Sequence, residues 1–421
     1  RKFIFIFIFI FCNLQNIYTQ NIYAGNIDCS FYKGAQVNNI NDIQKILIQE
    51  DKELIESYSC KKQNSNICTD KSICNIISDD AILKMTNQLE EGSEILEGHG
   101  SEIIRAKHTN GKTKYSVVLI HGLYLSPKAT KEFAELYAKL GFNVINIRLP
   151  GHFETPRQKL DSVKWQSWDK KVKQALKLAQ NLGEKVIVSG HSSGALLAQK
   201  ASLDYAHKVK GATPIAGLIG YAPTLQIKKK LISGLQTADS WLGTISGGKD
   251  IALSLITEYF SNSSEPIYAS LSPSLEVNKM SQYISNKYSK NNNNDDVGII
   301  DGDDNYNNES DEEKESKIIS DIYSPLSKIP VMIMDTDSDE IININYNKKV
   351  MKFLKQNSEK DIVHVVEKNS CLKHSVYLKK LLQKTRDPSI SDINKCSESI
   401  LDTKIQLLNF IKKNFSDRCN F

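Results

Sequence analysis

Short apolar runs alternate with amphipathic stretches from about residue 101 onward. Apolar runs bounded by polar residues or glycine indicate strands that are buried on both faces of a sheet. Stretches with apolar residues at helical spacing predict helices, and two of them end at a glycine, a common C-terminal signal. This alternation predicts an α/β fold with a mostly parallel central sheet and helices on both faces. The expected strands are 115–120, 142–147, 185–189, 216–221, 330–335 and 361–366, and the expected helices are 126–140, 165–182 and 195 to about 207.

Residues 226–325 interrupt the alternation. Within them, residues 286–317 are rich in asparagine and acidic residues and poor in aromatic and branched apolar ones. Such a composition buries too little surface to offset the entropy of ordering, so it predicts a disordered loop. From these patterns the chain divides into a signal-peptide-like segment (1–24), a cysteine-containing extension without a predicted role (25–100), the first part of the α/β core (101–225), an insertion (226–325) and the second part of the core (326–421).

The beginning of the sequence has the pattern of a secretory signal. Two basic residues precede nine apolar residues, 3–11, which are too few to cross a bilayer as a helix. A buried strand is the alternative, because Phe and Ile alternate there. None of the eight cysteines lies within 75–370, and peripheral cysteines favour disulfides formed in an oxidising compartment. We therefore expect export, to the medium, the periplasm or the cell envelope, with Cys12 as a candidate for lipid attachment.

Composition excludes some partners. The chain has 54 Lys and Arg against 49 Asp and Glu, a net charge of +5 without a dense basic stripe, so no nucleic-acid partner is expected. The cysteines lack the paired spacing of a zinc site, and the acidic residues near 301–304 lack the terminal Glu of a calcium loop. We expect neither a metal nor another cofactor.

The strongest chemical signal is Gly190-His191-Ser192-Ser193-Gly194. It follows a predicted strand and opens a predicted helix, which is the context of a nucleophile on a sharp strand-to-helix turn. The glycines remove side chains that would clash in such a turn, and the helix N-terminus stabilises developing negative charge. Ser192 is therefore the candidate nucleophile, with an ordinary glycine–serine loop as the alternative.

A serine nucleophile needs a base and an acid that orients the base. In folds with this turn the acid and then the histidine follow the serine along the chain. Asp339 is the first choice for the acid and Asp337 the second, because Asp339 lies where the loop turns away from strand 330–335. His374 follows strand 361–366 in a loop and is the candidate base. The remaining nearby candidates are Asp335, expected at the strand end, Glu340, the last choice, and His364, expected to pack within its strand.

Two backbone N–H groups are candidates for an oxyanion hole. One belongs to Ser193, directly after the nucleophile, and the other to Leu123, in the turn after strand 115–120. His121 in the same turn is interpreted as a structural, hydrogen-bonding residue.

Four ordered segments carry a resemblance: 117–127 (VVLIHGLYLSP), 141–152 (GFNVINIRLPGH), 165–168 (WQSW) and 188–194 (VSGHSSG). They resemble the bacterial carboxylesterase and monoacylglycerol lipase branch of the α/β-hydrolase superfamily, which is grouped with lysophospholipase-like and serine-aminopeptidase-like hydrolases. The resemblance covers about 103–285 and 318–415. It implies a Ser192–Asp339–His374 triad, an oxyanion hole at Leu123 and Ser193, and a helical cap within the insertion. Ser193 departs from relatives that often have Met there, and the insertion is longer than theirs.

Together these features predict an exported serine hydrolase that cleaves carboxylic esters through an acyl-enzyme. Acylglycerols, lysophospholipids and small acyl esters are the expected substrates. An acyltransferase or thioesterase with the same triad is one alternative, and a catalytically inactive, hydrolase-like binding protein is another. The lysines at 228–230 are interpreted either as a solvated charge run or as a peripheral contact with anionic lipid.

Overall fold

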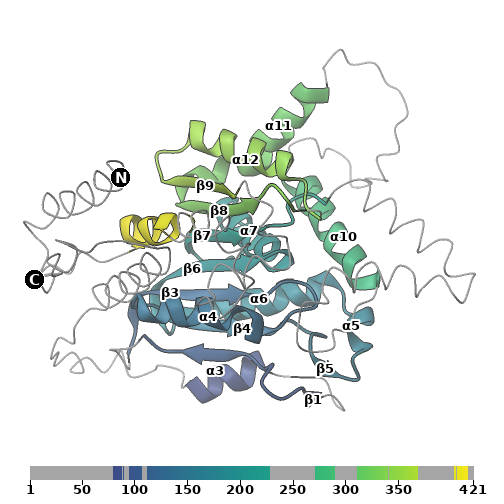
Figure 1. The fold of residues 1–421 in the computed structure, drawn as a ribbon, viewed down its shortest axis with the longest axis vertical. Helices are drawn as coiled ribbons and strands as arrows, with labels where there is room; N and C mark the ends of the chain where they lie inside the picture. The colour runs from purple at the N-terminus through teal and green to yellow at the C-terminus, as the bar shows by residue number, and fades with distance from the viewer. Residues whose placement is uncertain are drawn as a thin grey trace, which may run out of the picture.

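A seven-stranded sheet forms the centre of the described structure (Figure 1). Its strand order is β2-β4-β3-β6-β7-β8-β9, with β2 antiparallel to β4 and every other neighbouring pair parallel. The predicted α/β fold with a mostly parallel sheet is confirmed, and β2 is a strand that the sequence pattern did not indicate. The strands are β2 (Glu102–Ile104), β3 (Thr113–Ile120), β4 (Asn143–Ile147), β6 (Gly183–His191), β7 (Ile215–Tyr221), β8 (Val331–Thr336) and β9 (Ile362–Glu367), and a separate antiparallel pair is formed by β1 (Glu94–Ile95) and β5 (Glu154–Thr155).

The computed structural model describes residues 79–87, 89, 94–106, 111–227, 271–289, 311–339, 341–367, 403 and 405–415. The signal-like segment, most of the N-terminal extension, all eight cysteines, the lysines at 228–230 and His374 lie outside these residues. Export, lipid attachment and disulfide formation therefore stay predictions. Within the described residues, no helix has both the length and the apolar character needed to span a membrane.

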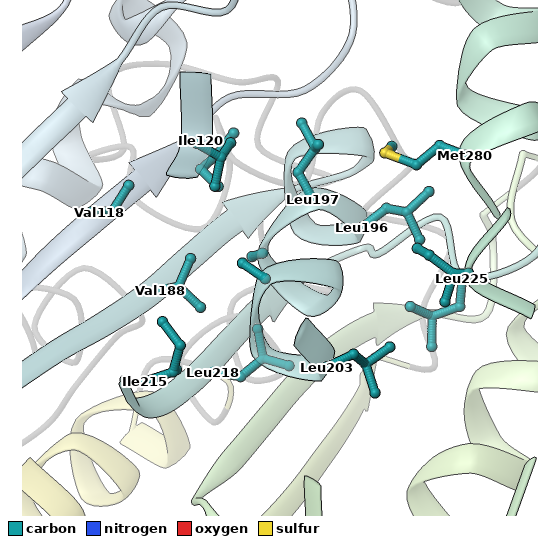
Figure 2. Packing of buried hydrophobic residues seen from close by; sticks show 14 of the residues in the cluster. Val118, Ile120, Val188, Leu196, Leu197, Leu203, Ile215, Leu218, Leu225 and Met280 are labelled. Atoms are coloured by element: carbon teal, nitrogen blue, oxygen red, sulfur yellow. The ribbon is translucent and has the colours of Figure 1, made fainter. Parts of the chain in front are cut away.

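Helices cover both faces of the sheet, as the buried strand pattern requires. Along β3, Val118 and Ile120 pack with one cluster of buried residues, whereas Val117 and Leu119 pack with the other. Figure 2 shows part of the first cluster, where strand residues meet leucines of α7. The first cluster is completed mainly by α6, α7, α10, α11 and α12, and the second by α4 and residues 405–415. The helices are α3 (Asp79–Thr86), α4 (Pro127–Lys139), α5 (Lys159–Ser162), α6 (Trp165–Ala179), α7 (Ser193–Ala206), α10 (Leu271–Tyr288), α11 (Asp311–Tyr323) and α12 (Ile344–Asn357).

The insertion between β7 and β8 contributes α10, α11 and a 3-10 helix at Ser324–Lys328. Helix α10 ends and α11 begins inside 286–317, so the prediction of a disordered loop is wrong for both ends of that range. Acidic residues open α11, where the helix dipole favours them, and Ile319 and Ile322 bury its inner face. Residues 290–310 lie outside the described structure.

A buried cluster of charges joins three helices on the first face of the sheet. The Lys200 ammonium on α7 is 2.9 Å from the Asp204 carboxylate and 3.0 Å from that of Asp169 on α6. From α10, Lys287 (3.0 Å) and the Tyr288 hydroxyl donate to the other oxygen of Asp204. Burial alone would raise the pKa of Asp204, but the hydrogen bonds from Tyr288 and Lys200 hold it well below its usual range. The cluster therefore fixes the C-terminal end of α10 on the core.

Candidate active site

Ser192 is the single residue between the end of β6 and the start of α7. Its backbone has φ 54° and ψ −121°, a conformation that residues with a side chain rarely adopt. Its N–H donates to the carbonyl of Tyr221 (2.8 Å), and its carbonyl accepts from the N–H groups of Ala195 (3.0 Å) and Leu196 (3.1 Å). Hydrogen bonds on both sides of the residue therefore hold this strained turn in place.

The two glycines of the motif are required by close backbone packing. A Cβ atom on Gly190 would lie 2.4 Å from the carbonyl oxygen of Gly194. A Cβ atom on Gly194 would lie 2.3 Å from the carbonyl oxygen of His121, at the end of the neighbouring strand β3. Both contacts involve backbone atoms, which cannot swing aside. The expectation that glycine is needed at these positions is confirmed.

The turn after β3 packs directly against Ser192. A Cβ atom on Gly122 would lie 3.2 Å from the Ser192 Cβ atom and 2.8 Å from Nδ1 of His191. Among the hydrogen bonds of the described residues, none uses the N–H of Leu123 or that of Ser193. Ser193 is the first residue of α7, where the helix leaves its N–H groups without an internal partner. Both candidate oxyanion donors thus lie on segments that contact the candidate nucleophile, with their N–H groups available.

His121 ties this turn to the loop after β4. Its Nε2 atom accepts a hydrogen bond from the N–H of Leu149 (3.0 Å), so the proton is on Nδ1, which donates to the carbonyl of Gly122 (2.8 Å). Burial, with a further contribution from neighbouring His152, lowers the pKa of His121 well below its usual value. A neutral imidazole with both nitrogens occupied agrees with the structural interpretation of His121.

The two favoured acid candidates have different environments. Asp339 is 1% exposed, and its Oδ1 atom accepts hydrogen bonds from the N–H groups of Ile341 (2.9 Å) and Ile342 (3.1 Å). The Asp337 side chain is 41% exposed and forms an ion pair with Lys348 (2.8 Å). Asp339 therefore has a fixed carboxylate within the fold, whereas the carboxylate of Asp337 lies at the surface.

Ser192 and Asp339 lie at the same edge of the sheet. The parallel strands β6 and β7 end level with each other, with His191 beside Tyr221, and β8 continues two residues past Met334, which lies beside Tyr221. Ser192 directly follows the first of these strands, and Asp339 follows the third after a short loop. The carboxyl edge of a parallel sheet is where α/β folds bind their ligands.

His374, the candidate base, and the side chain of Glu340 lie outside the described residues. Strand β9 ends at Glu367 beside β8, so His374 comes seven residues after the carboxyl edge that also holds the acid loop. Among the described residues, no group of three or more His, Cys, Asp and Glu is arranged to bind a metal ion.

Sequence reasoning missed a pair at this edge, formed by the buried carboxylate of Asp335 and the half-buried imidazole of His364. Nε2 of His364 on β9 lies 2.8 Å from Oδ2 of Asp335 on β8, and the Asn347 amide donates to the same carboxylate (3.1 and 3.2 Å). Burial raises the pKa of Asp335, although these hydrogen bonds oppose the rise. Strand β9 is three strands from β6, a lateral separation of about 14 Å, so His364 does not reach Ser192. The available signal was an acid near the end of one mostly apolar strand and a histidine within the neighbouring mostly apolar strand.

The family model described as serine aminopeptidase, S33, matches residues 111–285, from the start of β3 into α10. Over this stretch, the sequence is similar to that family. The match includes the Ser192 turn and the turn after β3. The match supports the predicted resemblance to the α/β-hydrolase superfamily. No curated protein matches the sequence.

Solved α/β-hydrolase structures similar to this chain include three lipolytic enzymes. A metagenome-derived lipolytic enzyme has 13% identity and a TM-score of 0.45, over 75% of this chain and 99% of that one. A soluble variant of the monoglyceride lipase of Saccharomyces cerevisiae, with a substrate analogue, has 15% identity and a TM-score of 0.44, over 76% and 94%. The monoacylglycerol lipase of Paleococcus ferrophilus has 17% identity and a TM-score of 0.43, over 73% and 97%.

Proposed function

We propose that this α/β-hydrolase cleaves carboxylic esters, with Ser192 as nucleophile, His374 as base and Asp339 as the acid that orients His374. The observation that carries the proposal is the forced conformation of Ser192 at the N-terminus of α7, next to two available N–H groups. An ordinary loop has no reason to hold a serine in this strained conformation. The buried, doubly hydrogen-bonded carboxylate of Asp339 supports its choice over Asp337.

In the proposed reaction, Ser192 Oγ forms a bond to the ester carbonyl carbon while His374 takes the hydroxyl proton. The N–H groups of Leu123 and Ser193 stabilise the resulting oxyanion. The carbonyl re-forms, the C–O bond to the alcohol breaks, and His374 gives its proton to the departing alcohol. Water then attacks the acyl-enzyme with His374 as base, and release of the carboxylic acid returns Ser192 to its hydroxyl form.

We propose acyl esters as the substrate class, namely acylglycerols, lysophospholipids or small esters. The family match over residues 111–285 supports this class, and the structurally similar proteins are named as lipolytic enzymes. A series of p-nitrophenyl esters and monoacylglycerols of increasing acyl length, assayed for kcat/KM, identifies the preferred chain. Uniformly negligible ester turnover, together with acyl transfer to an added alcohol or with thioester cleavage, would favour the alternative reactions of the same triad.

Labelling with a fluorophosphonate probe tests the nucleophile. The native protein is expected to label and Ser192→Ala is not, because only the serine Oγ attacks phosphorus. Ser193→Ala is the matched control, since it removes the adjacent buried hydroxyl but keeps the N–H proposed for the oxyanion hole. If the native protein does not label, or if Ser192→Ala still does, the assignment is wrong.

Paired substitutions test the acid. Asp339→Asn is expected to lower kcat by about 10⁴-fold, because an amide in place of the carboxylate no longer orients or stabilises the charged imidazole. Asp337→Asn removes a carboxylate two residues away, on the surface, and should leave kcat within about twofold. The reverse order of effects would transfer the role to Asp337.

A further inference from the structure

Tyr124 links the turn after β3 to helix α10 of the insertion. Its side chain is 2% exposed, and its hydroxyl lies 2.9 Å from the Ser274 hydroxyl in the first half of α10. The two residues are 150 positions apart in the sequence. One end of this contact therefore belongs to the segment that carries Leu123, and the other end to the helix placed over the core.

Tyr124 has a strained backbone conformation, which the contacts of its side chain must stabilise. The N–H of Leu125 donates to the carbonyl of Gly122 (3.2 Å), which closes a four-residue turn with Leu123 and Tyr124 as its central residues. Tyr124 has φ 59°, at the position where a type II turn normally has glycine. A bulky residue holds such a conformation only where its surroundings specify it. Here the surroundings are the buried ring site and the contact with Ser274.

Helix α10 is a fixed support for that contact. The Ser272 hydroxyl, two residues before Ser274, donates to the carbonyl of Asp161 (2.8 Å). The buried carboxylate of Glu276 accepts from the N–H of Trp165 (3.2 Å) at the start of α6. The charge cluster around Asp204 holds the far end of the helix. Ser274 is therefore anchored to the core independently of Tyr124.

We propose that Tyr124 is a positioning residue for the oxyanion hole, and that its hydrogen bond to Ser274 couples α10 to the turn that presents the N–H of Leu123. This inference rests on the proposed ester hydrolysis. It implies that the insertion contributes to the rate of the chemical step as well as to substrate access. Loss of the bond leaves the turn in place but allows the N–H of Leu123 to move away from the oxyanion.

Three variants test the coupling: Tyr124→Phe, Ser274→Ala and the double variant, assayed with a p-nitrophenyl ester. Each single variant is expected to lower kcat about 3- to 10-fold with KM nearly unchanged, the effect of one lost hydrogen bond. The double variant should be no slower than either single one, because both remove the same interaction. Inhibition by a trifluoromethyl ketone, which places an oxyanion in the hole, should weaken by the same factor. Ser274→Thr keeps a hydroxyl and should retain the native kcat.

Ser272→Ala is the matched control, because it also removes a hydroxyl contact of α10 but not one with the turn. It should leave kcat unchanged, because the contacts of Glu276 and the charge cluster around Asp204 still anchor α10. The inference is overturned if Tyr124→Phe keeps native kcat, if the two single effects add in the double variant, or if Ser272→Ala lowers kcat equally. Fluorophosphonate labelling of the native protein separates the two proposals: without labelling both fail, whereas labelling with an unaffected Tyr124→Phe rejects the coupling alone.

Discussion

Replacing Ser192 by glycine should stabilise the fold while abolishing activity. Ser192 has φ 54° and ψ −121°, a conformation that costs a residue with a Cβ atom about 1–3 kcal/mol. Glycine adopts positive φ without this cost. The fold holds the serine there because hydrogen bonds to Tyr221, Ala195 and Leu196 specify the turn. The strain thus depends on the side chain of Ser192, the proposed nucleophile, and is relieved when that side chain is removed.

The comparison with Ser192→Ala isolates the strain, because both variants lose the hydroxyl but only alanine keeps a Cβ atom. Glycine adds freedom to the unfolded chain, which opposes the gain by about 0.5–1 kcal/mol. The net expectation is that Ser192→Gly is more stable than Ser192→Ala by about 1 kcal/mol. For a domain of this size the corresponding rise in Tm is roughly 2–4 °C.

Urea denaturation and differential scanning calorimetry of the two variants measure the difference, with the fluorophosphonate probe confirming that neither labels. The native protein provides the third point and should be close to Ser192→Ala in stability. The reasoning is refuted if Ser192→Gly is equal to or less stable than Ser192→Ala. That result would mean that the turn at Ser192 stores no strain and that its conformation carries no information about function.

Four further outcomes are expected. Gly194→Ala should lower the free energy of unfolding by about 1–3 kcal/mol and reduce labelling, because its Cβ atom would meet backbone atoms at 2.3 Å; urea titration and the probe measure both. Lys200→Met should lower the free energy of unfolding by about 1–3 kcal/mol in the same titration, since Asp169 and Asp204 lose their fully buried cation and keep only the more exposed Lys173 and Lys287, whereas exposed Lys177→Met should change stability by less than about 0.5 kcal/mol. The folded-state pKa of Asp204 is depressed, so its contribution to stability is complete above the unfolded pKa of about 4 and is lost as pH falls through the folded value; urea midpoints measured from pH 6 to pH 2 should decline below about pH 4. His364→Gln should label normally with the fluorophosphonate probe but unfold more easily by about 1–3 kcal/mol, because its buried carboxylate partner loses a strong hydrogen bond; loss of labelling would assign His364 a catalytic part.

Features that depend on residues close together in the sequence could be predicted from it. The strands are apolar runs because both of their faces are buried. This pattern can be recognised in the sequence without knowing which strands are neighbours in the sheet. The turn at Ser192 is also local: steric limits on five consecutive positions specify glycine at Gly190 and Gly194. The side-chain environments of Asp337 and Asp339 were not visible, because exposure depends on how the loop after β8 packs.

Features that depend on distant pairs could not be predicted. Strand β2 has only three half-buried residues, so its pairing with β4 leaves no periodic pattern. The contacts of α10 join Tyr124 to Ser274 and Trp165 to Glu276, across more than a hundred positions in each case. Serine and glutamate are common on the exposed faces of helices, so their presence in the sequence does not indicate a contact. Their role in anchoring α10 is seen only when the helix is packed on the core. The end of α10 and the start of α11 were not predicted. Residues 286–317 have a low-complexity composition as a whole, and this composition obscures the start of an amphipathic helix within them.

The carboxyl edge of β8 shows why residue type alone does not assign a triad. Asp335 and His364 are a buried carboxylate and a half-buried imidazole in hydrogen-bond contact, the same two groups that a serine hydrolase requires. They are separated from Ser192 by strand spacing, because β9 is three strands from β6 and His364 lies within that strand. Asp339 differs by lying in the loop after β8, where the chain has left the sheet and its carboxylate is held by two backbone N–H groups. A histidine that is to reach both this loop and Ser192 must also lie beyond its strand, and His374, seven residues after β9, meets that condition whereas His364 does not.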